Sequence, residues 1–140
     1  MVGIIVITHD RLADELVNAT KLIVGALKGF AAISIKPDES VEEVSRRISK
    51  ALKEVDDGSG TLMLTDLFGG TPSNLSLSFL KDGKVEVLSG VNLPMMLTLA
   101  TSRDEKPLPE VAQMALTSGK KNIFIASELL ARKIGRQEKE

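Results

Sequence analysis

A continuous run of β-branched residues near the start of the chain, Ile4-Ile5-Val6-Ile7, most constrains the fold. Such a run is typical of a strand buried on both faces, rather than one that alternates between core and solvent. Strands of this kind belong to parallel sheets, because the helical crossovers between parallel strands cover both faces of the sheet. The run therefore predicts an α/β fold.

The rest of the chain alternates strand-like and helix-like segments, as this fold requires. Further strands are predicted at residues 30–35, 61–64, 85–88 and, very short, 122–125. We expect a three-layer α/β architecture, with helices on both faces of a mostly parallel central sheet. One domain is expected to span residues 1–140, with a terminal helix and charged tail over about 127–140.

Apolar spacing and capping residues predict where the helices lie. The first helix is expected to start at Asp10 as N-cap, to stop at Gly29, and to bury one face made of Leu12, Leu16, Ala19, Ile23 and Leu27. Capping residues predict two further helix starts, a capping box of Ser40 with Glu43 and a cap at Asn92 followed by Pro94. A later helix is predicted from about Glu110 to Thr117, closed by Ser118-Gly119.

Composition excludes several classes of function. The 18 Lys and Arg nearly balance 19 Asp and Glu, and no basic stripe interleaves with aromatic residues, so no nucleic-acid surface is expected. The chain has no cysteine and a single histidine, so neither a metal site nor a cofactor is expected. No apolar run approaches the roughly 20 residues of a membrane span, and no signal-peptide pattern is present. A cytoplasmic protein is expected.

Residues 65–74, TDLFGGTPSN, have the features of an anion site. Gly69 and Gly70 allow a ligand to approach the backbone, while Thr71 fits an N-cap and Pro72 the first helical position. The free N–H groups of such a helix start and its dipole favour a phosphoryl group. The alternative interpretation is a capped helix that follows a tight turn.

The only histidine, His9, directly follows the first predicted strand. In a parallel sheet the carboxyl ends of the strands form the edge at which ligands bind. Asp66 and the two glycines follow the third strand, and Gly90 follows the fourth, so all of them are expected along that edge. Imidazole is a suitable nucleophile near neutral pH, and a carboxylate bound to one ring nitrogen would fix its tautomer.

Three segments, residues 4–9, DLFGGTPSN at 66–74 and GVNLPMML at 90–97, resemble the IIA component of the mannose-family phosphotransferase system. The resemblance covers nearly the whole chain. It implies a phosphoryl carrier that accepts phosphate on histidine from the phosphocarrier protein HPr and passes it to a IIB subunit for sugar uptake. A membrane permease would be reached only through these partners.

The resemblance also implies the roles of individual residues. Asp66 would bind Nδ1 of His9, and Nε2 would carry the phosphoryl group. Gly69, Gly70 and Thr71 would hold the phosphoryl oxygens. Leu67, Phe68, Asn92 and Pro94 are expected at the rim of the pocket.

One departure from the family concerns the residues after the histidine. Many relatives have a small residue there, whereas this chain has Asp10 and Arg11. Asp10 places a negative charge beside a group that would bear a dianion. As a helix cap, it would be partly neutralised by the helix dipole, and Arg11 would favour the phosphoryl group.

Other functions remain open from the sequence. The same histidine domain serves as the phosphoryl-donor subunit of a dihydroxyacetone kinase, and phosphorylation of His9 could also regulate other proteins without transport. A flavodoxin-like flavin carrier is disfavoured, because no phosphate loop follows the first strand and no Trp or Tyr is present to stack on the ring.

The apolar character of the C-terminal region predicts that the chain forms an oligomer. The apolar residues around the fifth strand exceed what a single edge strand hides: Leu116, Phe124, Ile125, Leu129, Leu130 and Ile134. The resemblance implies a homodimer in which this strand crosses to the sheet of the partner and adds there as an antiparallel C-terminal edge strand. The alternative is a monomer whose terminal helix covers its own edge.

Overall fold

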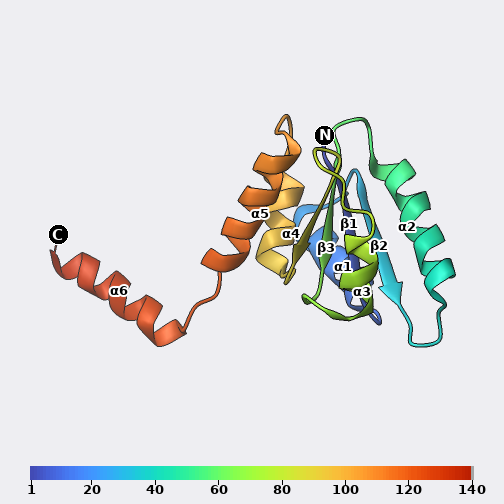
Figure 1. Cartoon of the computed structure of the whole chain (residues 1–140). Coiled ribbons are helices and arrows are strands. Elements are labelled where there is room, and N and C mark those ends of the chain that lie inside the picture. Colours follow the sequence, from blue (N-terminus) through green and yellow to red (C-terminus); the bar gives the residue numbers. More distant parts are fainter. Residues whose placement is uncertain (140) are drawn as a thin grey trace.

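The computed structural model describes the backbone of residues 1–139 and the side chains of residues 1–135. Over that range the chain forms strands β1 (Gly3–His9), β2 (Phe30–Ile35), β3 (Thr61–Thr65) and β4 (Val85–Ser89). Its helices are α1 (Leu12–Val24), α2 (Val41–Val55), α3 (Gly70–Leu77), α4 (Leu93–Ser102), α5 (Leu108–Lys121) and α6 (Ala126–Lys139). Strands and helices alternate as far as α4 (Figure 1). Within residues 1–139, no helix combines the length and the apolar character needed to cross a membrane.

The strands form one parallel sheet in the order β2-β1-β3-β4. The central strand β1 pairs with β2 on one side and with β3 on the other. The register sets His9 opposite Ile35 and Ile7 opposite Thr65. The four strands therefore end at one edge, which we call the carboxyl edge. The predicted α/β fold with a parallel sheet is confirmed.

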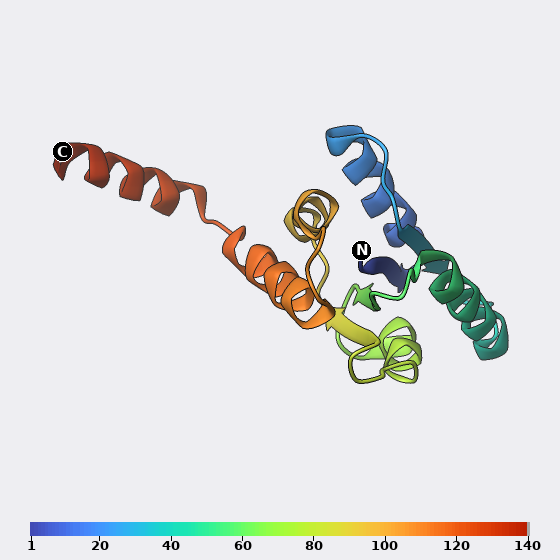
Figure 2. The ribbon, with the colours of Figure 1, turned by 90° about the horizontal axis from the view of Figure 1, so that it is seen from above.

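Both faces of the sheet are covered by helices, as the unbroken apolar run in β1 predicted. Ile4 and Val6 pack against α1, α4 and α5, whereas Ile5 and Ile7 pack on the opposite face against α2 and α3. All four side chains are fully buried. Viewed from above, α1, α4 and α5 lie on one side of the strands and α2 and α3 on the other (Figure 2).

Helix α1 buries a face that only partly matches the predicted one: Leu16 packs against the core as predicted, but the buried positions differ. Its buried residues are Ala13, Val17 and Thr20, while Leu12 and Ile23 are 45% and 57% exposed. The buried Thr8 hydroxyl accepts a hydrogen bond of 2.7 Å from the Ala13 N–H, which holds Ala13 rather than Leu12 against the sheet. The predicted stop at Gly29 is also wrong, because α1 ends at Val24 with Gly25 as its C-cap.

The start of the next helix follows its prediction, while the end of α5 does not. Ser40 accepts a hydrogen bond from the Glu43 N–H, as expected for a capping residue. Helix α5 does not stop at Ser118-Gly119 but continues to Lys121. A Cβ on Gly119 would lie 2.8 Å from Met95 Cε, so this glycine permits close packing of α5 on α4 rather than ending the helix.

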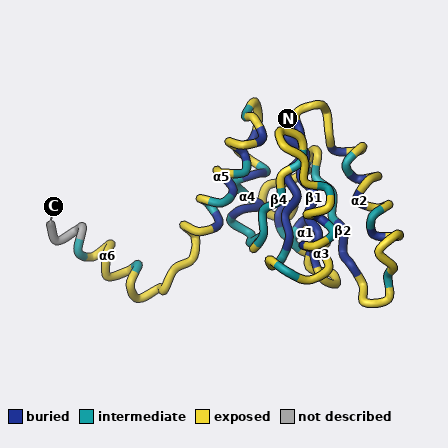
Figure 3. The backbone as a smooth tube through the Cα atoms, in the orientation of Figure 1, coloured by how far each residue is buried: buried dark blue, intermediate teal, exposed yellow. Residues whose placement is uncertain are grey.

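The predicted fifth strand is wrong for the chain as described. Residues 123–125 have no regular secondary structure and are exposed. They follow α5 and lead away from the sheet, so no strand lies beside them (Figure 1). The predicted terminal helix is present as α6 and extends away from the sheet. The segment from residue 121 to residue 128 is exposed throughout (Figure 3).

Arg103 links three segments near the amino ends of the strands. Its side chain, 3% exposed, donates hydrogen bonds to the carbonyl groups of Val2, Leu99 and Lys28. The guanidinium carbon also lies 4.7 Å from the centre of the Phe30 ring. Burial lowers the pKa of Arg103, although a guanidinium remains charged in proteins. Arg103 therefore supplies donors to three main-chain carbonyls, and its bonds to Val2 and Leu99 are buried.

We predict that Arg103→Met lowers the free energy of unfolding by about 2–4 kcal/mol, because buried carbonyl groups lose their donors. Urea unfolding of the purified chain measures the effect. Arg46→Met is the control, since Arg46 is an exposed arginine on α2. Equal unfolding midpoints for the two variants would show that the buried guanidinium contributes no more than a surface arginine.

Candidate functional site

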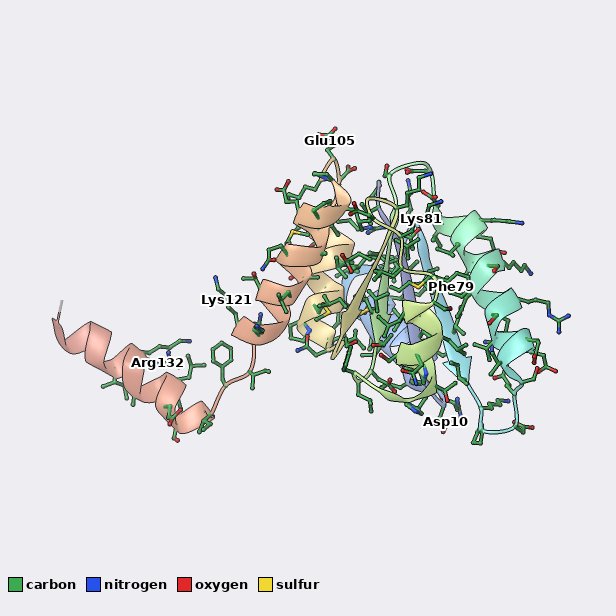
Figure 4. All side chains as sticks on the ribbon, in the orientation of Figure 1. Asp10, Phe79, Lys81, Glu105, Lys121 and Arg132 are labelled. Carbon is green, nitrogen blue, oxygen red and sulfur yellow. The ribbon has the colours of Figure 1, made fainter. Side chains whose placement is uncertain are left out.

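The carboxyl edge brings together the predicted histidine, aspartate and glycine-rich turn. His9 is the last residue of β1, and Asp66 directly follows β3, its neighbour in the sheet. Helix α3 then begins at Gly70. In Figure 4 this edge is the end of the sheet near the Asp10 label. The parallel register therefore places residues far apart in the sequence next to one another.

Two hydrogen bonds join His9 to one oxygen of Asp66. The Asp66 Oδ2 atom lies 2.8 Å from His9 Nδ1 and also accepts a bond of 2.9 Å from the His9 main-chain N–H. A carboxylate only accepts hydrogen bonds, so the proton of the neutral ring is placed on Nδ1 and the lone pair on Nε2. The His9 side chain is 52% exposed, and a reactant can therefore reach it.

Asp66 is held more firmly than the ring that it orients. Its side chain is 10% exposed, and its second oxygen accepts a bond of 3.0 Å from the Leu67 N–H. Burial acts to raise the pKa of Asp66, but the hydrogen bonds from the backbone and ring of His9 outweigh it, so the pKa lies below its ordinary value. Asp66 is therefore a carboxylate at neutral pH.

Gly70 faces the free nitrogen of the ring. A Cβ atom on Gly70 would lie 3.3 Å from His9 Nε2 and 3.2 Å from Cε1. Gly70 has φ +82° and its neighbour Gly69 has φ +96°, in the left-handed region that favours glycine. The first turn of α3 thus approaches Nε2 closely, with the positive end of its dipole on that side.

Thr71 belongs to the site but not as the predicted helix cap. The N-cap of α3 is Gly69. Within the described part of the chain, the Thr71 hydroxyl makes no hydrogen bond, unlike the hydroxyls of Ser76 and Ser78 near the end of this helix. Because α3 begins one residue before Thr71, that side chain is already within the helix. It lines a cleft of about 390 Å³ together with His9, Asp10 and Lys36.

Lys36 is one of two charged lining residues that sequence reasoning missed, and the other is Glu39. Lys36 follows β2, and β2 neighbours β1 in the sheet, so the carboxyl-edge rule includes it once the strand order is known. The sequence alone does not give that order. Its only signal was a cation placed at the end of a predicted strand.

The predicted role of Asp10 as N-cap of α1 is wrong. Arg11 occupies the N-cap position, and Asp10 adopts φ +48° while its N–H donates a bond of 2.8 Å to Ile35. The first-turn N–H that Asp10 would have bound is taken by Thr8. The Asp10 carboxylate therefore remains at the cleft, while Arg11 pairs with Glu15 at 3.6 Å.

The four residues expected at the rim lie in two places. Leu67 and Phe68 lie on the loop beside the site and are 49% and 78% exposed. Asn92 caps α4 by accepting from the Met95 N–H, and its amide donates to the Gly119 carbonyl. None of the four predicted rim residues, including Pro94 in the first turn of α4, lines the cleft at His9.

The fold and the site define a parallel α/β protein with a carboxylate-oriented histidine at a helix N-terminus. The family model described as "PTS system fructose IIA component" matches residues 3–116. The chain belongs to this EIIA-man family, and the resemblance found in the sequence is confirmed.

Individual relatives agree with this assignment. The chain is 26% identical over 131 residues to the fructose-specific EIIA component of Bacillus subtilis, covering 93% of this chain and 90% of that protein. It is 27% identical over 124 residues to the mannose-specific EIIAB component of Escherichia coli K12, covering 87% of this chain but 38% of that relative. A solved EIIA structure from Streptococcus agalactiae superposes with a TM-score of 0.83 at 29% identity, covering 91% and 99% of the two chains.

We predict that Gly70→Ala slows the reaction of His9 with diethylpyrocarbonate several-fold, since an added Cβ 3.3 Å from Nε2 would crowd the nitrogen that attacks the reagent. His9 is the only histidine, so the histidine signal reports this site alone. Gly69→Ala is the matched control, because its φ is also positive but an added Cβ meets nothing within 4 Å. Equal slowing in both variants would attribute the effect to backbone strain instead of contact with Nε2.

Proposed function

We propose that this protein is a phosphoryl carrier of a sugar phosphotransferase system, which accepts phosphate on His9 from HPr and passes it to a IIB subunit. The observation that carries the proposal is the His9–Asp66 pair, in which Nδ1 is bound at 2.8 Å and Nε2 faces the first turn of α3. Membership of the EIIA-man family supports it. Of the relatives named above, one is a fructose-specific EIIA component and one is a mannose-specific EIIAB component.

Transfer begins with the lone pair of His9 Nε2. That nitrogen attacks the phosphorus of the phosphorylated donor, a new P–N bond forms, and the bond between phosphorus and the donor breaks with its electron pair left on the donor. The ring gains positive charge as the bond forms. Asp66, already ionised and bound to Nδ1–H, stabilises that charge without taking the proton. The same steps in reverse deliver the group to IIB.

The start of α3 holds the phosphoryl oxygens in this proposal. Gly69 and Gly70 provide backbone that a phosphoryl group can approach, and the Thr71 hydroxyl is not used to cap the helix. Donors arranged in advance around a transferring group stabilise the charge that its oxygens accumulate. The exposed Leu67 and Phe68 beside the site offer apolar contacts to HPr or IIB. The carrier acts in the cytoplasm and meets a membrane permease only through these partners.

A homodimer accounts for the exposed C-terminal segment. Ile123, Phe124 and Ile125 are 75%, 51% and 64% exposed, and Leu130 and Ile134 on α6 are 58% and 56% exposed. Apolar side chains grouped in this way along one segment are typical of an interface. We propose that residues 123–125 pair with the outer strand β4 of a partner, which would extend the sheet by one strand.

The function is tested by incubating the protein with enzyme I, HPr and phosphoenolpyruvate. We expect one phosphoryl group per chain by mass spectrometry, labile in acid and stable in base, and none in His9→Ala. Asp66→Asn is expected to keep the fold but to slow transfer, because the amide does not stabilise positive charge on the ring. Phosphate retained by His9→Ala would overturn the assignment of the acceptor, and a normal rate in Asp66→Asn would leave Asp66 with a structural role only.

Assembly is tested by light scattering on the full chain and on a truncation after Asn122, which leaves α5 complete. We expect the full chain to be dimeric at micromolar concentration and the truncation to be monomeric. The double variant Phe124→Ser, Ile125→Ser keeps the chain length and is expected to weaken the dimer. A monomeric full chain would refute the strand exchange, and a dimeric truncation would place the interface elsewhere.

A further inference from the structure

The His9 cleft is lined by two carboxylates and one lysine, and the carboxylates alone would repel a phosphoryl dianion. Asp10 and Glu39 bring two carboxylates to the cleft, and Lys36 brings the one ammonium among its described lining residues. A phosphoryl group on Nε2 would add a further negative charge beside Asp10. The site therefore needs a cation that is not already bound to another group.

Glu39 is already compensated by other groups. One of its oxygens accepts a bond of 2.9 Å from the Lys36 main-chain N–H, and the other accepts a bond of 2.7 Å from Arg47 Nη1. The backbone bond and the arginine lower the pKa of Glu39, against the effect of burial. Arg47 is therefore committed to Glu39, and the uncompensated carboxylate at the cleft is that of Asp10.

Lys36 has the position and the freedom to meet a phosphoryl group. It follows Ile35, which pairs with His9 and accepts a hydrogen bond from the Asp10 N–H. Within the described part of the chain, its ammonium makes no ion pair within 4.0 Å. A lysine carries three donors on a flexible stem, so its head can move onto a group that comes and goes. Arg11, paired with Glu15, lines an adjoining hollow that shares Lys36 with the cleft, but it does not line the cleft itself.

We propose that the Lys36 ammonium contacts the phosphoryl group on His9 and offsets the charge of Asp10. In the unphosphorylated protein Lys36 is a solvated cation near Asp10. During transfer the N–H donors of Lys36 bind one phosphoryl oxygen, while Thr71 approaches the group from α3. This inference rests on the proposed phosphorylation of His9 and adds a second, chain-specific source of positive charge to it.

The test uses a donor that has no docking surface. Phosphoramidate transfers its phosphoryl group to histidine as its P–N bond breaks and ammonia leaves, so the rate reports the cleft alone. We expect Lys36→Gln to slow phosphorylation of His9 by roughly 10-fold, the scale of losing one charged contact to the group in transfer. Lys36→Arg is expected to retain most of the rate. Lys84→Gln, with the same charge change at the opposite end of the sheet, is expected to match the wild type.

Asp10 provides the reciprocal measurement. Asp10→Asn is expected to speed phosphorylation, and the double variant Lys36→Gln, Asp10→Asn is expected to recover most of the lost rate. Equal slowing in Lys36→Gln and Lys84→Gln would reduce the effect to net charge and overturn the proposal, as would a normal rate in Lys36→Gln. Reaction with phosphoramidate but not with phosphorylated HPr would overturn the carrier function and leave the contact of Lys36 supported.

Discussion

The parallel register of β1 with its two neighbours is the constraint on which the site depends. Pairing Ile7 with Thr65 brings the end of β1 to the start of the loop that carries Asp66. Pairing His9 with Ile35 brings Lys36 to the same edge from the other side. A slip of one residue in either pairing would turn the strand side chains to the opposite face and separate the histidine from its carboxylate.

The fold could be predicted because its main signals are local and repeated. An unbroken run such as Ile4 to Ile7 needs cover on both faces, and helix spacing between the strands supplies it. The meeting of His9, Asp66 and Gly70 followed from one general rule about strand ends. Lys36 could not be predicted in the same way, because the sequence does not state that β2 is the neighbour of β1.

Three of the errors concern helix ends, where residue preferences alone do not decide which group fills a position. Asp10 and Thr71 both fit the residue preferences of an N-cap, yet the Thr8 hydroxyl binds the first turn of α1 and Gly69 occupies the cap position of α3. Gly119 fits a helix end, yet its missing side chain is used to admit Met95. Propensity ranks the residues that suit a position, but the tertiary contacts decide which one fills it.

The cleft at His9 owes part of its chemistry to Asp10 and Thr71, which were predicted as N-caps but do not cap a helix. If Asp10 capped α1, its charge would be bound to main-chain N–H groups, and if Thr71 capped α3, its hydroxyl would be committed as an acceptor. Because the Thr8 hydroxyl binds the first turn of α1 and Gly69 is the N-cap of α3, the Asp10 carboxylate and the Thr71 hydroxyl line the same cleft as His9. The hydroxyl favours a phosphoryl group there and the carboxylate opposes it. In our proposal Lys36, which the strand order brings to this edge at the end of β2, offsets the charge of that carboxylate.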